Sequence, residues 1–175
     1  MTIDDRGDEI AQPVKSYRTE MMDLSDLVTP EAILPSLKAN SKKQALQAIA
    51  EKSAAMTRVQ EKDIFETLIK REKLGSTGVG GGIAIPHGKL AGLDRIFGLF
   101  ARLPRPIDFE ALDEHPVDLI FLLLAPENAG ADHLKALARI ARLFREPGVA
   151  GKLRASADES ALYAVLTEGA THNAA

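Results

Sequence analysis

One histidine, His87, follows a run that is rich in glycine and reads GSTGVGGGIAIPHGK from Gly75 to Lys89. Imidazole keeps a substantial neutral, nucleophilic fraction near pH 7, so its ring nitrogen can accept a phosphoryl group. Backbone N–H groups of a glycine-rich turn can bind phosphoryl oxygens, and phosphoryl transfer depends mainly on positioning and charge stabilisation. Pro86 fixes φ directly before the histidine. A nucleophilic histidine and a purely structural turn are both compatible with this stretch, and the residues alone leave both open.

The glycine run matches neither common nucleotide-binding motif. A Walker A loop has four residues between its glycines and a Ser or Thr after its lysine, but five residues separate Gly82 from Gly88, and Leu90 follows Lys89. The dinucleotide motif G-x-G-x-x-G would need a glycine where Ile83 stands. No convincing helix follows, so the helix N-terminus that both motifs use is missing. A nucleotide site is therefore disfavoured.

The other histidines are His115, His133 and His172, and the chain contains no cysteine. They form no H-x-x-x-H or H-E-x-x-H pair, and a site built from His87 and His133 lacks a third ligand. His115 precedes an apolar run and His172 lies close to the C-terminus, so we expect both to be solvated. We therefore expect no metal and no other cofactor.

The composition indicates a cytoplasmic globular protein. The chain has 175 residues, enough for one domain, and its net charge of −3 argues against a nucleic-acid binder. The absence of cysteine suits a reducing compartment. No apolar run is long enough for membrane insertion, and the first residues do not resemble a signal peptide. Residues 1–21 are polar without apolar periodicity, and we expect a disordered N-terminal tail there.

The elements that must position His87 alternate between helices and strands. Residues 23–37 predict a short helical turn and an edge strand that Pro35 interrupts. Apolar runs predict strands over 96–103 and 117–125, the second central in a sheet, with a loop or short hairpin between them. Helices are expected over 41–56, 61–73 and 131–146 and in two shorter segments after Pro147, the last ending at Gly169. The fold class is therefore α/β, with a mixed sheet flanked by helices.

Capping boxes and apolar stripes define these helices further. Ser41 with Gln44 and Ser156 with Glu159 each form a capping-box pattern. The helix over 131–146 has an apolar stripe, which predicts its buried face. The members of the stripe are Leu134, Leu137, Ile140, Ala141 and Phe144.

The segment REKLGSTGVGGGIAIPHGKL, residues 71–90, resembles the active-site region of phosphotransferase-system enzyme IIA domains of the mannitol/fructose type, and most closely their nitrogen-regulatory branch. The later segment PIDFEALDEHPVDLIFLLLAPENAGADHLKALARIARLF fits the same family. The resemblance covers about residues 23–168. It implies a single-domain sandwich of the mannitol-type enzyme IIA fold over residues 22–169, with a C-terminal tail over 170–175.

The resemblance implies roles for individual residues. His87 matches the histidine that carries the phosphoryl group on Nε2, and His133 matches the second active-site histidine of the family. Arg71 matches the arginine of the R-E-K segment, whose guanidinium could neutralise phosphoryl charge. The glycines Gly78, Gly80, Gly81, Gly82 and Gly88 are the candidate phosphate-binding loop.

Two residues depart from the family pattern. Gly81 stands where relatives often have Asn or Glu, so any role of that position is in doubt here. His115 stands where relatives usually have a small or amide residue, and it does not take the part of the second active-site histidine. We leave Glu72 and Lys73 to solvent.

The implied function is that of a histidine phosphocarrier. An HPr-like phosphocarrier (NPr) would charge His87, and the phosphorylation state would control regulated target proteins, with potassium transporters, sensor kinases and stringent-response enzymes as family-level possibilities. Two interpretations stay open for Ile83, Ile85 and nearby Phe97 or Leu99: a part in the surface that meets the donor, or a place in the core, which is commoner for apolar strand residues. Two alternatives stay open: an enzyme IIA subunit that passes phosphate to a separate IIB component for sugar import, and a binding module that has lost phosphotransfer.

Overall fold

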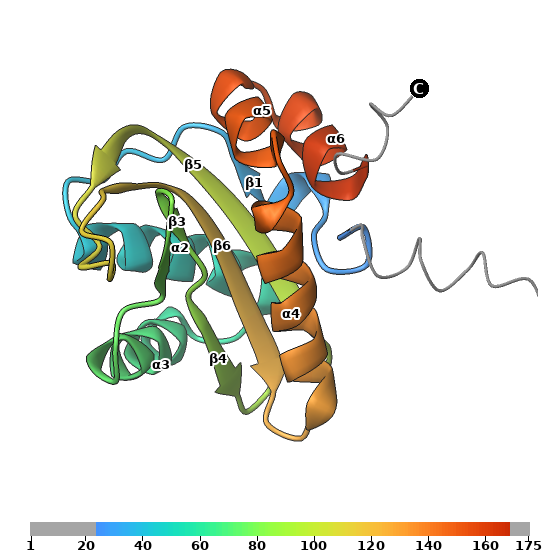
Figure 1. The fold of residues 1–175 in the computed structure, drawn as a ribbon. Coiled ribbons are helices and arrows are strands. Elements are labelled where there is room, and N and C mark those ends of the chain that lie inside the picture. Colours follow the sequence, from blue (N-terminus) through green and yellow to red (C-terminus); the bar gives the residue numbers. More distant parts are fainter. Residues whose placement is uncertain (1–23, 169–175) are drawn as a thin grey trace, which may run out of the picture.

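The structure, a computed structural model, describes residues 24–168 and contains a six-stranded mixed sheet between two groups of helices (Figure 1). The predicted tails and the helix end at Gly169 lie outside the described residues. The strands are β1 (Ile33–Leu34), β2 (Gly78–Gly80), β3 (Ile83–Ala84), β4 (His87–Leu90), β5 (Phe97–Ile107) and β6 (Val117–Pro126). They lie in the order β1-β5-β6-β3-β2, and β4 also pairs with β6.

Strand β6 is the centre of the sheet, as its apolar sequence predicts. It pairs antiparallel with β5 along one edge and parallel with β3 and β4 along the other. Every residue of β6 except Asp118 is buried. The two strands on its second edge follow one another: β3 pairs at Leu119 and Ile120, and β4 begins at Leu123. This edge therefore carries the whole segment that ends in His87.

Strand β5 is longer than the apolar run at 96–103 predicts. It continues to Ile107, and its pairing with β6 is irregular between Arg102 and Ile107. Pro104 and Pro106 lie within the irregular part, where a missing N–H removes no regular ladder bond. The expected loop therefore begins at residue 108 rather than 104. Strand β1 lies at the sheet edge and ends directly before Pro35, which confirms the predicted edge strand.

Helices α2 (Lys42–Thr57) and α3 (Glu61–Lys73) pack together against β5 and β4. Ser41 caps α2, since its hydroxyl accepts the Gln44 N–H at 3.2 Å, and the Gln44 side chain accepts the Asn40 N–H in return. This capping pattern is thus confirmed. Ile64 and Leu68 of α3 are fully buried, as predicted.

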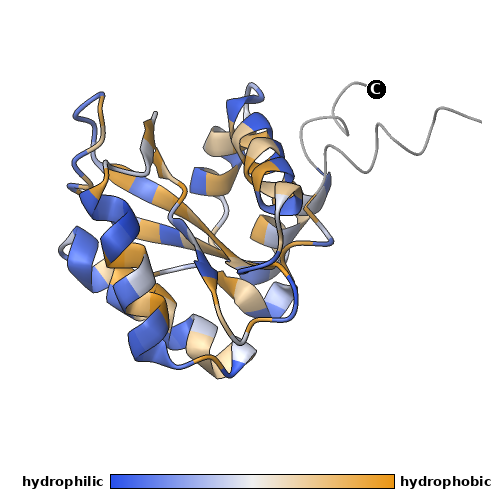
Figure 2. Ribbon diagram, turned by 90° about the horizontal axis from the view of Figure 1, so that it is seen from below, coloured by the Kyte–Doolittle hydropathy of each residue, from blue (hydrophilic) through white to orange (hydrophobic). Residues whose placement is uncertain are grey.

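Helices α4 (Ala131–Arg145), α5 (Val149–Ala155) and α6 (Glu159–Glu168) form the second group, with α4 running along β6 (Figure 1). Figure 2 shows the apolar ribbon of both groups facing the sheet between them. Two sequence predictions are wrong here. Leu134 is 67% exposed, because it lies off the buried face of α4. Asp158, and not Ser156, accepts the N–H of Ala161 at the start of α6, while the Ser156 hydroxyl donates to the Lys152 carbonyl.

Between residues 24 and 168, no helix combines the length and apolar character needed to cross a membrane.

Candidate functional site

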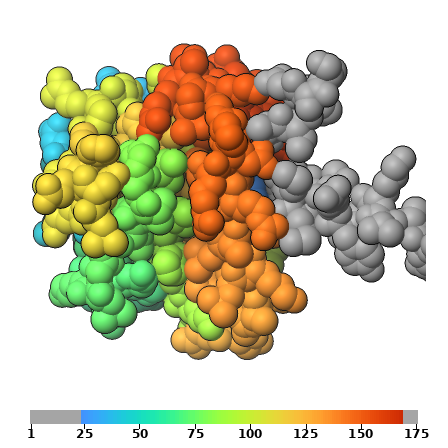
Figure 3. Space-filling model, viewed as in Figure 1, coloured from blue at the N-terminus to red at the C-terminus, as the bar shows by residue number. Residues whose placement is uncertain are grey.

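His87 opens strand β4 and is held in one orientation by its own backbone neighbourhood. Its Nδ1 lies 2.9 Å from the carbonyl oxygen of Ile85. A carbonyl only accepts, so Nδ1 carries the proton and Nε2 keeps the lone pair in the neutral ring. The ring is half-buried, and the backbone of His87 is in register with Leu123 of β6. Figure 3 shows the green segment that contains β4 reaching the surface between α3 and α4.

Arg71, in the last turn of α3, contacts Nε2 of His87. Its Nε–H donates to Nε2 of His87 at 3.3 Å, which agrees with an unprotonated Nε2, and its Nη1 donates to the Gly75 carbonyl at 2.8 Å. Thr67 lies one turn earlier on the same face of α3 and packs on Gly88, where a Cβ would come within 2.5 Å of its methyl group. Gly88 therefore lets α3 approach β4 closely enough for Arg71 to reach His87.

His133, in the first turn of α4, is the second imidazole at this place. Its ring centroid lies 5.7 Å from that of His87, with the two planes 49° apart. His133 is only 8% exposed, so it is not the solvated helix-end histidine that its position alone suggests. Its Nε2 is buried without a hydrogen-bond partner among the described residues. The structure thus brings Arg71, His87 and His133 together from three elements.

Both histidines are held neutral. Burial lowers the pKa of His87 below its ordinary 6.5, and the Arg71 charge acts in the same direction, while the Ile85 carbonyl and the Glu72 charge oppose it. Burial likewise lowers the pKa of His133, helped by the charges of His87 and Lys89. At neutral pH the Nε2 lone pair of His87 is therefore available, and the site offers a nucleophile beside a guanidinium.

The glycine run does not form a cradle around His87. Gly80 ends β2, and Gly81 and Gly82 make the turn to β3, with φ values of +100°, +66° and +80° in order. Because β3 pairs with β6 at Leu119 and His87 pairs at Leu123, the turn lies about 13 Å from His87 along the strand direction. Of the five glycines expected to bind phosphate, only Gly88 adjoins the histidine.

The turn is instead clamped by side chains at its own end of the sheet. The Asp113 carboxylate accepts the Gly81 N–H at 2.9 Å, and Arg154 donates to the Gly81 carbonyl at 2.6 Å. Arg154 also binds Asp118 at the start of β6. The positive φ values and these clamps account for glycine here without a ligand. Gly78 has a separate reason, since a Cβ would come within 2.7 Å of the Ala111 Cβ.

The sequence prediction for Glu72 is wrong. This carboxylate is buried, binds Lys42 at 2.7 Å and accepts the Thr77 N–H at 3.2 Å. One feature of the sequence could have indicated that Glu72 is buried. A carboxylate in the last turn of a helix interacts unfavourably with the helix dipole, whereas the neighbouring Lys70 and Lys73 interact favourably. An acidic residue at such a position indicates a specific partner.

The predicted docking residues are also largely internal. Ile83, Ile85 and Leu99 are buried, and Phe97 is half-buried. Exposed apolar side chains lie at other positions: Leu74 directly follows α3, which carries Arg71, and is 84% exposed, and Leu134 follows His133 in α4. These two were not predicted as surface contacts.

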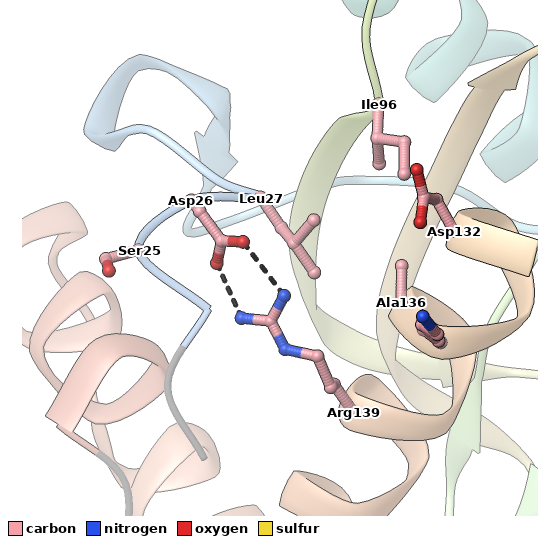
Figure 4. A pocket seen from close by; sticks show the side chains of 8 residues that line it. Ser25, Asp26, Leu27, Ile96, Asp132, Ala136 and Arg139 are labelled. Carbon is pink, nitrogen blue, oxygen red and sulfur yellow. Dashed lines mark hydrogen bonds and ion pairs between the residues drawn. The ribbon is translucent and has the colours of Figure 1, made fainter. Parts of the chain in front are cut away.

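A pocket beside α4 is separate from the histidine pair (Figure 4). It lies between residues 25–27, Ile96 and one side of α4, and Arg139 binds both carboxylate oxygens of Asp26 at its wall. Neither His87 nor His133 belongs to the described lining. Within residues 24–168, no group of three or more His, Asp or Glu side chains is arranged to hold a metal.

Comparison with known proteins identifies the family of this chain. The family model described as "Phosphoenolpyruvate-dependent sugar phosphotransferase system, EIIA 2" matches residues 26–169. A nitrogen regulatory protein of Bradyrhizobium diazoefficiens is 68% identical over 145 residues, which cover 83% of this chain and 95% of the relative.

Two solved structures have the same fold. The nitrogen regulatory protein IIA-Ntr from Neisseria meningitidis superposes with a TM-score of 0.76 at 36% identity, covering 87% of this chain and all of that one. Mannitol IIA from Escherichia coli superposes with a TM-score of 0.69 at 20% identity, over 80% of this chain and 99% of that one, which shows the fold alone.

Proposed function

Since the chain belongs to the EIIA 2 family of the phosphoenolpyruvate-dependent sugar phosphotransferase system, within its nitrogen-regulatory branch, we propose that it accepts a phosphoryl group on Nε2 of His87 from a phosphorylated HPr-like protein, NPr. The observation that carries this proposal is the hydrogen bond between Nδ1 of His87 and the Ile85 carbonyl. It leaves Nε2 as the nitrogen with a lone pair, at the surface between α3 and α4.

In the transfer step, the Nε2 lone pair attacks phosphorus as the bond from phosphorus to the donor nitrogen breaks. The proton on Nδ1 stays in place, so the phosphorylated ring is an imidazolium. The Ile85 carbonyl stabilises this cation by accepting the hydrogen bond from Nδ1–H, and for the same reason it raises the pKa of His87. No base is needed for the attack.

Arg71 and His133 act on the phosphoryl group. The guanidinium that donates to Nε2 in the free protein turns to the phosphoryl oxygens when Nε2 becomes bonded to phosphorus, and its planar set of donors suits them. The unpartnered Nε2 of His133 donates to another oxygen once it carries the proton of its ring. Both interactions form only as the phosphoryl group arrives, so they favour transfer.

The output of this carrier is regulatory. A phosphoryl group adds a charge of up to about −2 at the surface between α3 and α4. Such a change alters contacts with a target protein that docks over His87, and exposed Leu74 and Leu134 supply apolar contact at its two sides. Candidate targets are potassium transporters, sensor kinases and stringent-response enzymes.

The test is a labelling experiment with enzyme I, NPr and radioactive phosphoenolpyruvate. We expect acid-labile phosphate on the wild-type protein and none on His87→Ala. Absence of label on the wild type would refute the carrier and leave a binding module. A subsequent chase with sugar IIB components distinguishes the outputs: rapid loss of label to a IIB protein would replace the regulatory role by one in sugar import.

A further inference from the structure

A buried carboxylate, Glu72, lies next to Arg71 in the sequence and takes no direct part in the proposed transfer. Its side chain is 5% exposed and contacts Lys42 of α2, whose Nζ lies 2.7 Å away. The same carboxylate accepts both the backbone N–H and the hydroxyl of Thr77, which is itself buried. Removal of Lys42 would leave the Glu72 carboxylate buried and unpaired. The loss of stability would be far larger than the stabilisation that an exposed ion pair contributes.

Lys42 connects this group to a third segment. Its Nζ also donates to the Phe109 carbonyl at 3.4 Å and lies 5.1 Å from the centre of the Phe109 ring. The ion pair therefore joins α2, the end of α3, the segment before β2 and the loop after β5. A group tied to four segments determines where Thr77 lies.

Two hydrogen bonds lead from Thr77 to the imidazole of His87. The Thr77 carbonyl accepts the N–H of Ile85 at 2.9 Å. The Ile85 carbonyl in turn accepts Nδ1–H of His87 at 2.9 Å. Ile85 falls between β3 and β4 and has no register partner on β6. Its N–H and its carbonyl belong to successive peptide groups, so the bond to Thr77 fixes the chain before the Ile85 carbonyl, and the Leu123 N–H, which donates to the Pro86 carbonyl at 3.0 Å, fixes the chain after it.

We propose that Glu72 is a positioning residue: through Thr77 and Ile85 it aims the carbonyl that keeps the proton on Nδ1 of His87 and leaves Nε2 as the nucleophile. The effect on transfer rate rests on the proposed function, whereas the effect on the tautomer does not. Glu72 and Arg71 leave the same helical turn on different sides. One turn of α3 thus sets the tautomer of His87 and places the guanidinium at its Nε2.

The charge of Glu72 has a second, direct effect in the same direction. It opposes the lowering of the His87 pKa by burial, so it stabilises the imidazolium that phosphorylation creates. The carboxylate therefore supports the phosphorylated ring without touching it.

The experiment compares Glu72→Gln with Asp118→Asn. Asp118 is a matched control because its carboxylate also binds a cation, Arg154, and anchors the same β2–β3 hairpin, but at the end away from His87. Three quantities are measured for each variant: the His87 tautomer from ring nitrogen NMR shifts, the single-turnover transfer constant at saturating phospho-NPr, and the urea midpoint of unfolding.

We expect both variants to lower the urea midpoint, but only Glu72→Gln to populate the Nε2–H tautomer of His87. The transfer constant of Glu72→Gln should fall by about tenfold or more, because a small displacement of a reacting group slows the reaction strongly. The concentration of phospho-NPr needed for half-saturation should change little. Asp118→Asn should keep the wild-type tautomer and a transfer constant within about twofold of wild type. A wild-type tautomer and transfer constant in Glu72→Gln would overturn the proposal.

Thr77 supplies a second pair of variants in case Glu72→Gln does not fold. Thr77→Val removes the hydroxyl that Glu72 binds and keeps the backbone groups, while Thr77→Ser restores the hydroxyl. We expect the valine variant to share the tautomer shift and the serine variant to resemble wild type. If both keep the wild-type tautomer, the proposal is wrong. If Glu72→Gln shifts the tautomer but NPr does not label even the wild-type protein, the positioning role is supported and the phosphocarrier is refuted.

Discussion

Arg71 donates from Nε to Nε2 of His87 at 3.3 Å, so the guanidinium covers the nitrogen that is proposed to attack phosphorus. A second donor of the same side chain is held by the Gly75 carbonyl, which closes α3. In the unphosphorylated protein, both hydrogen bonds hold the guanidinium against Nε2. In the proposed transfer, the Nε–H leaves the lone pair and the guanidinium follows the incoming charge.

Replacement of Arg71 tests both its contact with Nε2 of His87 and its proposed contact with the phosphoryl group. In Arg71→Lys a single ammonium replaces the planar donors, and we expect the single-turnover transfer constant to fall by about a hundredfold. Arg71→Met should do the same and raise the pKa of His87, because the guanidinium charge lowers it. Rapid-quench labelling and NMR titration measure the two effects. Lys70→Met, at the exposed neighbouring position, is the control, and an equal loss there would argue for a general charge effect.

His133 is expected to assist without becoming the phosphorylated residue. His133→Ala should slow labelling by about tenfold or more, because the buried Nε2 donor is lost, while the label stays on His87. His133→Gln keeps an N–H donor and should lose less. Phosphopeptide mapping locates the label, and labelling of His133→Ala at the wild-type rate would contradict this role.

The pH dependence of transfer follows from the lowered pKa of His87. Burial and the Arg71 charge lower this pKa, the Ile85 carbonyl and the Glu72 charge raise it, and the net pKa lies below the ordinary 6.5. The decline of the transfer constant with falling pH should therefore be centred below 6.5. A decline centred above pH 6.5 would show that the ring is not held neutral.

Stability should change with pH in the same direction. The unfolded chain binds protons at the ordinary histidine pKa, whereas folded His87 binds them only at lower pH, so unfolding is favoured as pH falls. This contribution to the free energy of unfolding is complete above pH 6.5 and is lost as pH falls through the folded pKa. Urea unfolding of wild type and His87→Ala between pH 7.5 and 5 measures it, with His115→Ala as the exposed control.

The glycine turn is expected to be structural. In Gly82→Ala the new Cβ would approach Arg154 to 2.5 Å at a φ of +80°, and we expect a loss of about 1–3 kcal/mol in the free energy of unfolding. Gly81→Asn meets no atom within 4 Å and suits a φ of +66°, so its effect should stay below about 0.5 kcal/mol. Transfer constants of both folded variants should equal that of wild type. A selective loss of transfer in Gly81→Asn would restore a phosphate-binding role to the turn.

Local patterns in the sequence predicted most of the elements. The unbroken apolar run of β6 indicated a strand covered on both faces, and the capping pair Ser41 and Gln44 marked the start of α2. Such features depend on neighbours within a few residues, so they can be predicted from the sequence alone. Resemblance to a family then singled out Arg71, His87 and His133, which lie as far as 62 positions apart in the chain.

Tertiary structure alone decided which residues share an environment. Glycine content could not separate Gly88, which lets α3 approach β4, from Gly80, Gly81 and Gly82, which lie at a turn about 13 Å away. Glu72 looked like a solvated helix-end charge, because its partners Lys42 and Thr77 come from other segments. The sequence by itself determined most of the elements and, through a family resemblance, the candidate nucleophile. Burial and the meeting of distant segments decided the tautomer of His87, its neutral state and its neighbours, since these depend on contacts that form only when the sheet and helices pack.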